Sequence, residues 1–329
     1  MLAVGPNGAG KTNLLESLHV ATQGFSPRTR SDAQLIRFGE EGARVAIAGE
    51  HGGSQVAVEV VLRTGEAKRA RLNGAPLRAA EELRARLPTL VFTPDRLAIV
   101  KGGPAVRRAY FDRALGRLFP SRAAAPTDYA AALAQRNGAL RRVSAGVSPR
   151  DALEPWTQRI AELGRVLVGA RQQVVDLLSP AFAASAHELR LEGAALRYEG
   201  EPAAAEELDA RLEQDLQRGF TGLGPHLHDV AIGAGARDLR SFGSQGEQRV
   251  AVLSLLLAEA ELLRERGSAP LLLLDDVLSE LDPERREILA GRIRRPGAQA
   301  LLTATSRAAL PGEPDTLVEV TPGRAAAVS

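Results

Sequence analysis

The sequence predicts an α/β protein in which a mixed sheet is joined by an antiparallel β-meander and interrupted by a helical arm. At the N-terminus an apolar run, a glycine-rich loop and an amphipathic helix follow one another. Alternating apolar residues then indicate strands, and the middle third is rich in Ala, Arg, Leu and Glu at helical spacing. Because strand-like runs return after this third, the arm is expected to be an insertion in an α/β head.

The elements of the first hundred residues follow from local patterns. Residues 1–4 predict a strand, and residues 11–21 predict a helix with leucines on one face. Alternation over residues 44–71 predicts the antiparallel meander, with a turn at Asn73-Gly74. Residues 89–93 predict one more strand, which the following proline ends.

The rest of the chain is predicted to form the arm and the second part of the head. Residues 104–216 are predicted to be mostly helix, so the head is expected to comprise residues 1–103 and 217–329. No heptad repeat is sustained in the arm. The returning part predicts a long apolar helix to about residue 263, followed by strand 271–274, helix 283–294 and strand 300–305.

Composition excludes several classes of protein. The 329 residues are 44% hydrophobic and 25% charged, and no uncharged apolar run reaches the length of about 18 residues that a membrane span needs. There is no cysteine, which excludes disulfides, thiolate metal sites and a cysteine nucleophile. The first residues lack the features of a signal peptide, so a cytoplasmic location without membrane partners is expected.

The glycine-rich loop matches the phosphate-binding pattern G-x-x-x-x-G-K-[ST] in full. Its glycines let backbone N–H groups point at phosphates, Lys11 supplies a positive charge and Thr12 binds Mg²⁺. The loop is therefore predicted to bind ATP with Mg²⁺; the alternative is a strand-to-helix turn without ligand. The predicted contacts are Gly5, Pro6, Asn7, Gly8, Ala9, Gly10, Lys11, Thr12 and Asn13.

Two acidic residues follow the apolar strand at 271–274. A nucleotide hydrolase needs an acid beside the phosphate loop to hold Mg²⁺ and another group to orient or deprotonate the attacking water. Asp275 is predicted to hold the metal and Asp276, with Lys11, to be catalytic. Alternatively, the two acids only cap the next turn.

Two further segments narrow the class. Ser241 to Arg249 reads SFGSQGEQR before a long helix, and Ser279 to Asp282 follows the paired acids. The combination resembles the ABC-type ATPases, in which a serine–glycine signature contacts the γ-phosphate bound to the other subunit. The resemblance implies that Ser244, Gly246 and Asp282 contact nucleotide across a dimer. By itself, Ser244 with Glu247 is also typical of a helix capping box.

From Gly5 to about Thr305 the chain is similar to the RecF family of bacterial recombination mediators. The family is expected to have a head related to the chromosome-maintenance ATPases and a short helical arm. The resemblance implies binding of gapped or duplex DNA without sequence preference, an ATP-dependent homodimer, a weak DNA-stimulated ATPase, and cooperation with RecR and RecO in loading RecA. The motifs that carry the resemblance are Thr93-Pro94-Asp95, Val100 to Pro104, Arg107 to Asp112, Gly224-Pro225-His226, and the signature with the paired acids.

The chain departs from the family pattern in places. It begins at the strand of the phosphate loop, where family members carry earlier strands, so a truncated start is expected. A charged position and an acid of the family's GPHRDD turn are Leu227 and His228 here. Gln34 is the candidate for the glutamine that senses the γ-phosphate, and Thr303 or Thr305 stands where transporter ATPases have a histidine.

Three other functions are weighed against this one. A transporter ATPase subunit is disfavoured by the large insertion, and a coiled-coil chromosome-organising ATPase by the missing heptads. An interaction scaffold that binds no nucleotide is the third.

Other conspicuous residues have simpler interpretations. His226 and His228 lack the neighbouring ligands of a metal site, and Trp156 has the spacing of a core residue. Arginine clusters are typical of solvated surfaces or phosphate contacts. The clusters at 107–108 and 292–295 are the leading candidates for DNA contacts. The clusters are Arg107-Arg108, Arg141-Arg142 and Arg292 to Arg295.

Overall fold

The described residues of the head build a mixed sheet of six strands in the order β13-β12-β1-β11-β10-β6. All neighbouring pairs are parallel except β12 and β13. Parallel strands place their carboxyl ends at one edge of the sheet, where ligands bind in such folds. The strands are β1 (Leu2–Val4), β6 (Thr89–Phe92), β10 (Leu271–Leu274), β11 (Gln299–Ala304), β12 (Leu317–Thr321) and β13 (Arg324–Val328).

This computed structural model describes residues 1–29, 31–51, 53–77 and 80–328. The described residues form two compact units. Unit 1 comprises Met1–Leu97, Glu188–Arg190 and Val252–Ser329, and unit 2 comprises Ala98–His187 and Leu191–Ala251. None of the helices in the described ranges combines the length and apolar character that crossing a bilayer requires.

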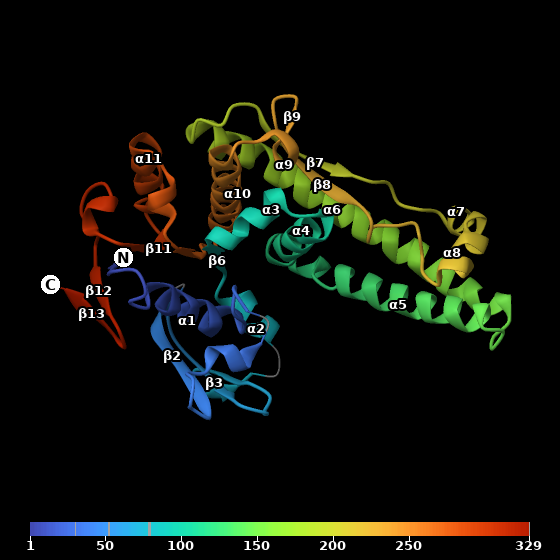
Figure 1. The fold of residues 1–329 in the computed structure, drawn as a ribbon, viewed down its shortest axis with the longest axis horizontal. Helices are drawn as coiled ribbons and strands as arrows, with labels where there is room; N and C mark the ends of the chain where they lie inside the picture. Colours follow the sequence, from blue (N-terminus) through green and yellow to red (C-terminus); the bar gives the residue numbers. More distant parts are fainter. Residues whose placement is uncertain (30, 52, 78–79, 329) are drawn as a thin grey trace. The chain divides into compact units, whose positions relative to one another are not determined.

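In unit 1 the predicted meander is confirmed. Strands run antiparallel in the order β2-β3-β4-β5, and helix α1 packs on β2 and β3 (Figure 1). Asn73 and Gly74, with φ of 49° and 81°, make the left-handed two-residue turn expected of Asn-Gly. The elements are α1 (Lys11–Gln23), β2 (Gly42–His51), β3 (Ser54–Arg63), β4 (Arg69–Leu72), β5 (Ala75–Pro76) and α2 (Ala80–Arg86).

Unit 1 is completed by segments from the end of the chain. The apolar strand β10 lies between β6 and β11, and its leucines from position 272 on are buried. The predicted helices and strands of this region are confirmed within a few residues. They are α10 (Gln245–Glu265), which continues from unit 2, the 3₁₀ helix η5 (Val277–Glu280) and α11 (Pro283–Ile293).

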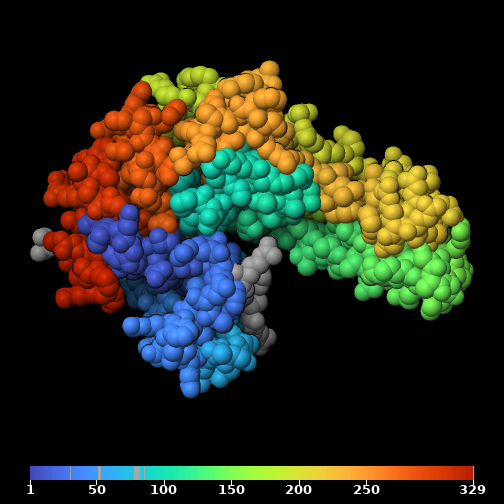
Figure 2. Space-filling view, viewed as in Figure 1, coloured from blue at the N-terminus to red at the C-terminus, as the bar shows by residue number. Residues whose placement is uncertain are grey.

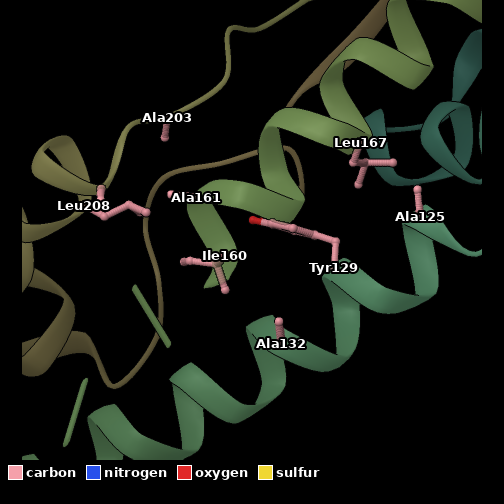
Figure 3. Close-up of a cluster of buried hydrophobic side chains, with 9 residues drawn as sticks. Ala125, Tyr129, Ala132, Ile160, Ala161, Leu167, Ala203 and Leu208 are labelled. Carbon is pink, nitrogen blue, oxygen red and sulfur yellow. The ribbon is translucent and has the colours of Figure 1, made fainter. Parts of the chain in front are cut away.

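Unit 2 is the arm. Its long helices α5 and α6 enclose an apolar core in which the Tyr129 side chain extends from α5 toward α6 (Figure 3). Figure 2 shows the surface of α8, in yellow, beside that of α5, in green. Trp156 packs against a second core cluster, which confirms its core role. The helices are α3 (Ala98–Lys101), α4 (Pro104–Leu118), α5 (Ala125–Ser144), α6 (Glu154–Glu188), α7 (Ala205–Ala210), α8 (Leu212–Arg218) and α9 (Leu239–Phe242).

The arm also contains strands that the sequence pattern did not predict. Strand β7 (Ala194–Glu199) pairs antiparallel with β8 (Asp229–Ala234), which pairs with β9 (Arg237–Asp238). This ladder ties residues after 217 to the arm, so residues 217–251 cluster with unit 2, whereas the expected boundaries of 104 and 216 assigned them to the head. A single sequence shows where a strand lies better than which strand it pairs with.

Candidate functional site

The predicted phosphate loop connects the carboxyl end of β1 to the N-terminus of α1. Two of its glycines, Gly8 and Gly10, have φ of 82° and 105°, a backbone region that other residues rarely adopt. At Gly5 a Cβ atom would lie 2.3 Å from the backbone oxygen of Val320 in β12. The glycines therefore occupy positions where the backbone itself requires them.

Lys11 and the start of α1 give this loop a positive character. The Lys11 side chain is largely buried, and its Nζ donates hydrogen bonds to the carbonyls of Gly5 at 2.7 Å and Pro6 at 3.0 Å. Helix α1 has neither a capping side chain nor an acid in its first turn. Its N–H groups and dipole thus favour an anion, which is the arrangement that binds phosphate in this loop type.

The structure brings Thr12 and Asp275 together across 263 residues of sequence. The Thr12 hydroxyl donates to the two carboxylate oxygens of Asp275 at 3.1 and 3.0 Å. Only one strand, β11, separates β1 from β10 in the sheet. Because these strands are parallel, the loops that follow β1 and β10 leave the same edge of the sheet. A hydroxyl beside a carboxylate supplies the hard oxygen ligands that Mg²⁺ prefers, so the residues present fit this metal.

Asp276 stands next to this pair in an unusual backbone conformation. Its φ of 49° lies in the left-handed region, and its backbone N–H donates to the Thr303 hydroxyl at 2.9 Å. Asp276 precedes η5, yet within the described part of the chain its carboxylate makes no capping hydrogen bond. A simple capping role therefore does not account for Asp276.

The serine–glycine motif heads helix α10 in unit 2, and Ser244 and Gly246 are exposed. The predicted capping box is confirmed: the Glu247 N–H donates to the Ser244 hydroxyl at 3.2 Å, and the Ser244 N–H donates to Glu247 at 2.8 Å. The Ser244 N–H and the Arg237 guanidinium lower the pKa of the Glu247 carboxyl.

Asp282 begins helix α11. Its carboxylate accepts the backbone N–H of Arg285 at 2.9 Å and pairs with the Arg285 guanidinium, also at 2.9 Å. The backbone hydrogen bond is the main reason that the pKa of Asp282 lies below its usual value. The carboxylate is thus ionised and held in place at a helix N-terminus.

The remaining candidate residues from the sequence differ in their burial and in their partners. Gln34 is exposed on the 3₁₀ helix η1 (Asp32–Leu35) and accepts a hydrogen bond from Thr29. Thr305 is exposed beyond β11, whereas Thr303 is fully buried and contacts both paired acids. In the sequence, Thr303 and Thr305 were singled out only by their place near the position of the transporter histidine. The contacts of Thr303 with both acids follow from the strand order, which places β11 beside β10.

The expectation that Arg107 contacts DNA is wrong. Arg107 is 3% exposed, and its guanidinium binds both carboxylate oxygens of Asp229 at 2.7 and 2.5 Å and the carbonyl of Gly102 at 2.8 Å. The Arg292 side chain is 9% exposed and pairs with Glu188. The helical spacing of these arginines places them inward, where their charge is neutralised by partners.

His226 and His228 also have structural partners in unit 2. The Tyr129 hydroxyl lies 2.8 Å from His226 Nδ1, and the Tyr198 hydroxyl lies 2.8 Å from His228 Nδ1. Burial is the main cause that lowers the pKa of both imidazoles, that of His228 to about 4. Both rings are therefore neutral at physiological pH and serve as hydrogen-bonding partners.

Together, the sheet order and the loops at its carboxyl edge define an ABC-type ATPase head of the kind that RecF, RecN and SMC proteins share. The family model described as the RecF/RecN/SMC N terminal domain matches residues 1–328. The chain is 38% identical to the DNA replication and repair protein RecF of Myxococcus xanthus, covering 92% of this chain and 84% of that one.

Two further comparisons point to the same family. The RecF protein of Anaeromyxobacter sp. strain K is 37% identical, with 92% of this chain and 86% of the relative covered. A solved structure of the recombination mediator RecF with ATP in the RecFOR pathway superposes with a TM-score of 0.85 at 28% identity, over all of this chain and 91% of the other. The chain belongs to the RecF family. The assignment confirms the resemblance and excludes the transporter and coiled-coil alternatives.

Proposed function

We propose that this protein is an ATP-dependent DNA-binding protein of recombinational repair. It binds ATP at the phosphate loop, dimerises, hydrolyses the nucleotide slowly with stimulation by DNA, and helps RecR and RecO to load RecA at gapped DNA. The observation that carries the proposal is the contact of Thr12 with Asp275, which joins the two halves of a nucleotide site. Relatives named for DNA replication and repair and for the RecFOR pathway support the biological setting.

Each residue of the site has a proposed task. Thr12 and Asp275 hold Mg²⁺, which when bound neutralises phosphate charge. Lys11 supplies a further positive charge from within the loop, and the loop N–H groups bind the phosphate oxygens. Asp276 orients or deprotonates the attacking water. These residues lie at one edge of a rigid sheet, which keeps their geometry fixed.

The signature residues carry the proposed dimerisation. Ser244 and Gly246 are exposed at the N-terminus of a 21-residue helix, and the capping box leaves N–H groups of its first turn for a phosphate. Asp282 is exposed and fixed at the start of α11. We propose that these three residues reach the γ-phosphate and loop of a second copy, so that ATP joins two heads.

Light scattering with ATP and with ADP tests the proposal. Dimers should form with ATP and not with ADP, because only ATP has the γ-phosphate. Asp276→Asn should bind ATP but hydrolyse it poorly, and should therefore accumulate dimers. Ser244→Asn keeps a residue type that caps helices well but changes the signature, so it should stay monomeric while remaining folded. If Asp276→Asn binds ATP and stays monomeric, the dimer proposal is wrong.

A further inference from the structure

Thr303 is a buried polar residue at the centre of the candidate site, and the proposed chemistry above does not use it. It lies near the end of β11, the strand between β1 and β10, and pairs in register with Ala3 of β1. Its side chain has no exposed surface. A threonine that is buried in a central strand needs hydrogen-bond partners to be tolerated.

The partners of Thr303 are the two acids that follow β10. Its hydroxyl donates to Oδ1 of Asp275 at 2.7 Å and accepts the backbone N–H of Asp276 at 2.9 Å. The single hydroxyl proton is therefore directed at a carboxylate, and a lone pair is directed at an N–H group. Both contacts are within unit 1, and each has the length of a good hydrogen bond.

One of these hydrogen bonds constrains the side chain of Asp275, and the other constrains the backbone of Asp276. The bond to Oδ1 fixes the plane of the Asp275 carboxylate, which also faces the Thr12 hydroxyl. The bond to the N–H of Asp276 supports a backbone with φ of 49°, which a residue other than glycine seldom adopts. One side chain on the intervening strand thus sets the direction of both carboxylates.

We infer that Thr303 is a positioning residue that aims Asp275 at the metal and Asp276 at the water through its two hydrogen bonds. The inference rests on the proposed binding of ATP with Mg²⁺. Partners that orient metal ligands typically change metal affinity or activity by about 10-fold to 100-fold when removed. Valine has the shape of threonine but would leave an oxygen of Asp275 and the N–H of Asp276 without this partner.

The test compares T303V with T303S and a matched control. Thr89 is another buried threonine of the same sheet; its hydroxyl donates to the carbonyl of Leu87 at 3.1 Å, and T89V removes it at the opposite edge. Calorimetry measures ATP affinity over a Mg²⁺ titration, and a phosphate-release assay measures kcat. T303V should need about 10-fold more Mg²⁺ to reach the same ATP affinity, which is its Mg²⁺ requirement, and should show a lower kcat.

Three results distinguish positioning from general stability. ATP affinity without Mg²⁺ should be unchanged in T303V, T303S should restore the Mg²⁺ requirement, and T89V should match the wild type. If T303V loses its native circular dichroism, T303A replaces it under the same criteria.

Two outcomes overturn the inference in different ways. If the wild type binds ATP with Mg²⁺ and T303V has the same Mg²⁺ requirement and kcat, or T303S fails to restore them, the role of Thr303 is wrong and the proposed function stands. If the wild type binds no ATP with Mg²⁺, the proposed function fails and this role fails with it.

Discussion

The surroundings of each charged side chain decide what it can do in this protein. Lys11 and Arg107 are both buried cations, but Lys11 is held by carbonyls of the phosphate loop, whereas Arg107 is neutralised by Asp229. Only the first has a charge available to a ligand. Residue type and spacing alone made both appear to be phosphate contacts.

Replacing Lys11 with alanine should weaken ATP binding because it removes a charge-assisted contact to phosphate. Such contacts contribute about 1.5–3 kcal/mol, which corresponds to about 10-fold to 100-fold in affinity. Calorimetry with ATP and Mg²⁺ measures the change. Lys101→Ala is the matched control, because Lys101 is an exposed lysine at the end of α3 and its loss gives the same change in net charge. Equal affinities of Lys11→Ala and the wild type would exclude the proposed nucleotide site.

At the scale of elements, strand β8 is joined to helix α4 by an ion pair whose arginine is buried. Arg107 of α4 binds Asp229 at the start of β8, and Arg171 of α6 binds Asp112 of α4 at 2.8 Å. Because both guanidinium groups are buried, each depends on the carboxylate of its partner, which is itself only partly exposed. The ion pairs fix the strand ladder of the arm to its helices.

Asp229→Asn should destabilise the arm because it leaves the Arg107 charge buried without a carboxylate. Breaking a buried pair in this way costs about 3–5 kcal/mol. Urea denaturation followed by circular dichroism measures the free energy of unfolding. Asp209→Asn, at an exposed position on α7, is the control and should change it by less than about 0.5 kcal/mol. A loss of similar size in both variants would contradict the role of the ion pair.

The turn before β8 should make the arm sensitive to acid. Burial, followed by the charge of Arg171, lowers the pKa of His228 from 6.5 to about 4. Since the folded-state pKa lies below the unfolded one, the contribution to stability is full above pH 6.5 and is lost as pH falls toward 4. Thermal unfolding at several pH values should show a smaller loss for His228→Asn than for the wild type.

His187→Asn controls for the loss of one imidazole at an exposed position. It should retain the acid sensitivity of the wild type. An unchanged pH profile in His228→Asn would show that this histidine does not contribute to the sensitivity.

At the scale of the whole molecule, binding to DNA should depend on ATP and on salt. A protein that neutralises about six phosphates shows a slope of log K against log salt near −5. In one of the three predicted arginine clusters, every arginine is exposed. This cluster consists of Arg141 and Arg142 at the end of α5. Replacing both with alanine should reduce the magnitude of the slope by about 2, measured by filter binding with ATP and confirmed dimers.

Exposed arginines with acidic partners provide the control for that experiment. Arg159 pairs with Glu162 and Arg197 with Glu199, so their charges are already offset. Their double alanine variant should keep the slope. If the Arg141 and Arg142 variant also keeps it, the DNA track lies elsewhere.

The sequence by itself determined the features that depend on neighbours along the chain. The phosphate loop, the Asn73-Gly74 turn and the capping box of Ser244 and Glu247 each involve a few consecutive residues, whose backbone preferences are fixed by residue type. The apolar strand before Asp275 and Asp276 was equally visible, because strands of a buried parallel sheet are continuous apolar runs.

Only the tertiary structure decided which of these features meet. The contact of Thr12 with Asp275, the bonds of Thr303 to both acids and the pairing of β7 with β8 depend on strand order. A single sequence does not specify strand order, because many pairings satisfy the same local pattern. The inward direction of Arg107 was hidden for the same reason, since a buried arginine is tolerated only where folding supplies its carboxylate, here Asp229 from 122 residues away.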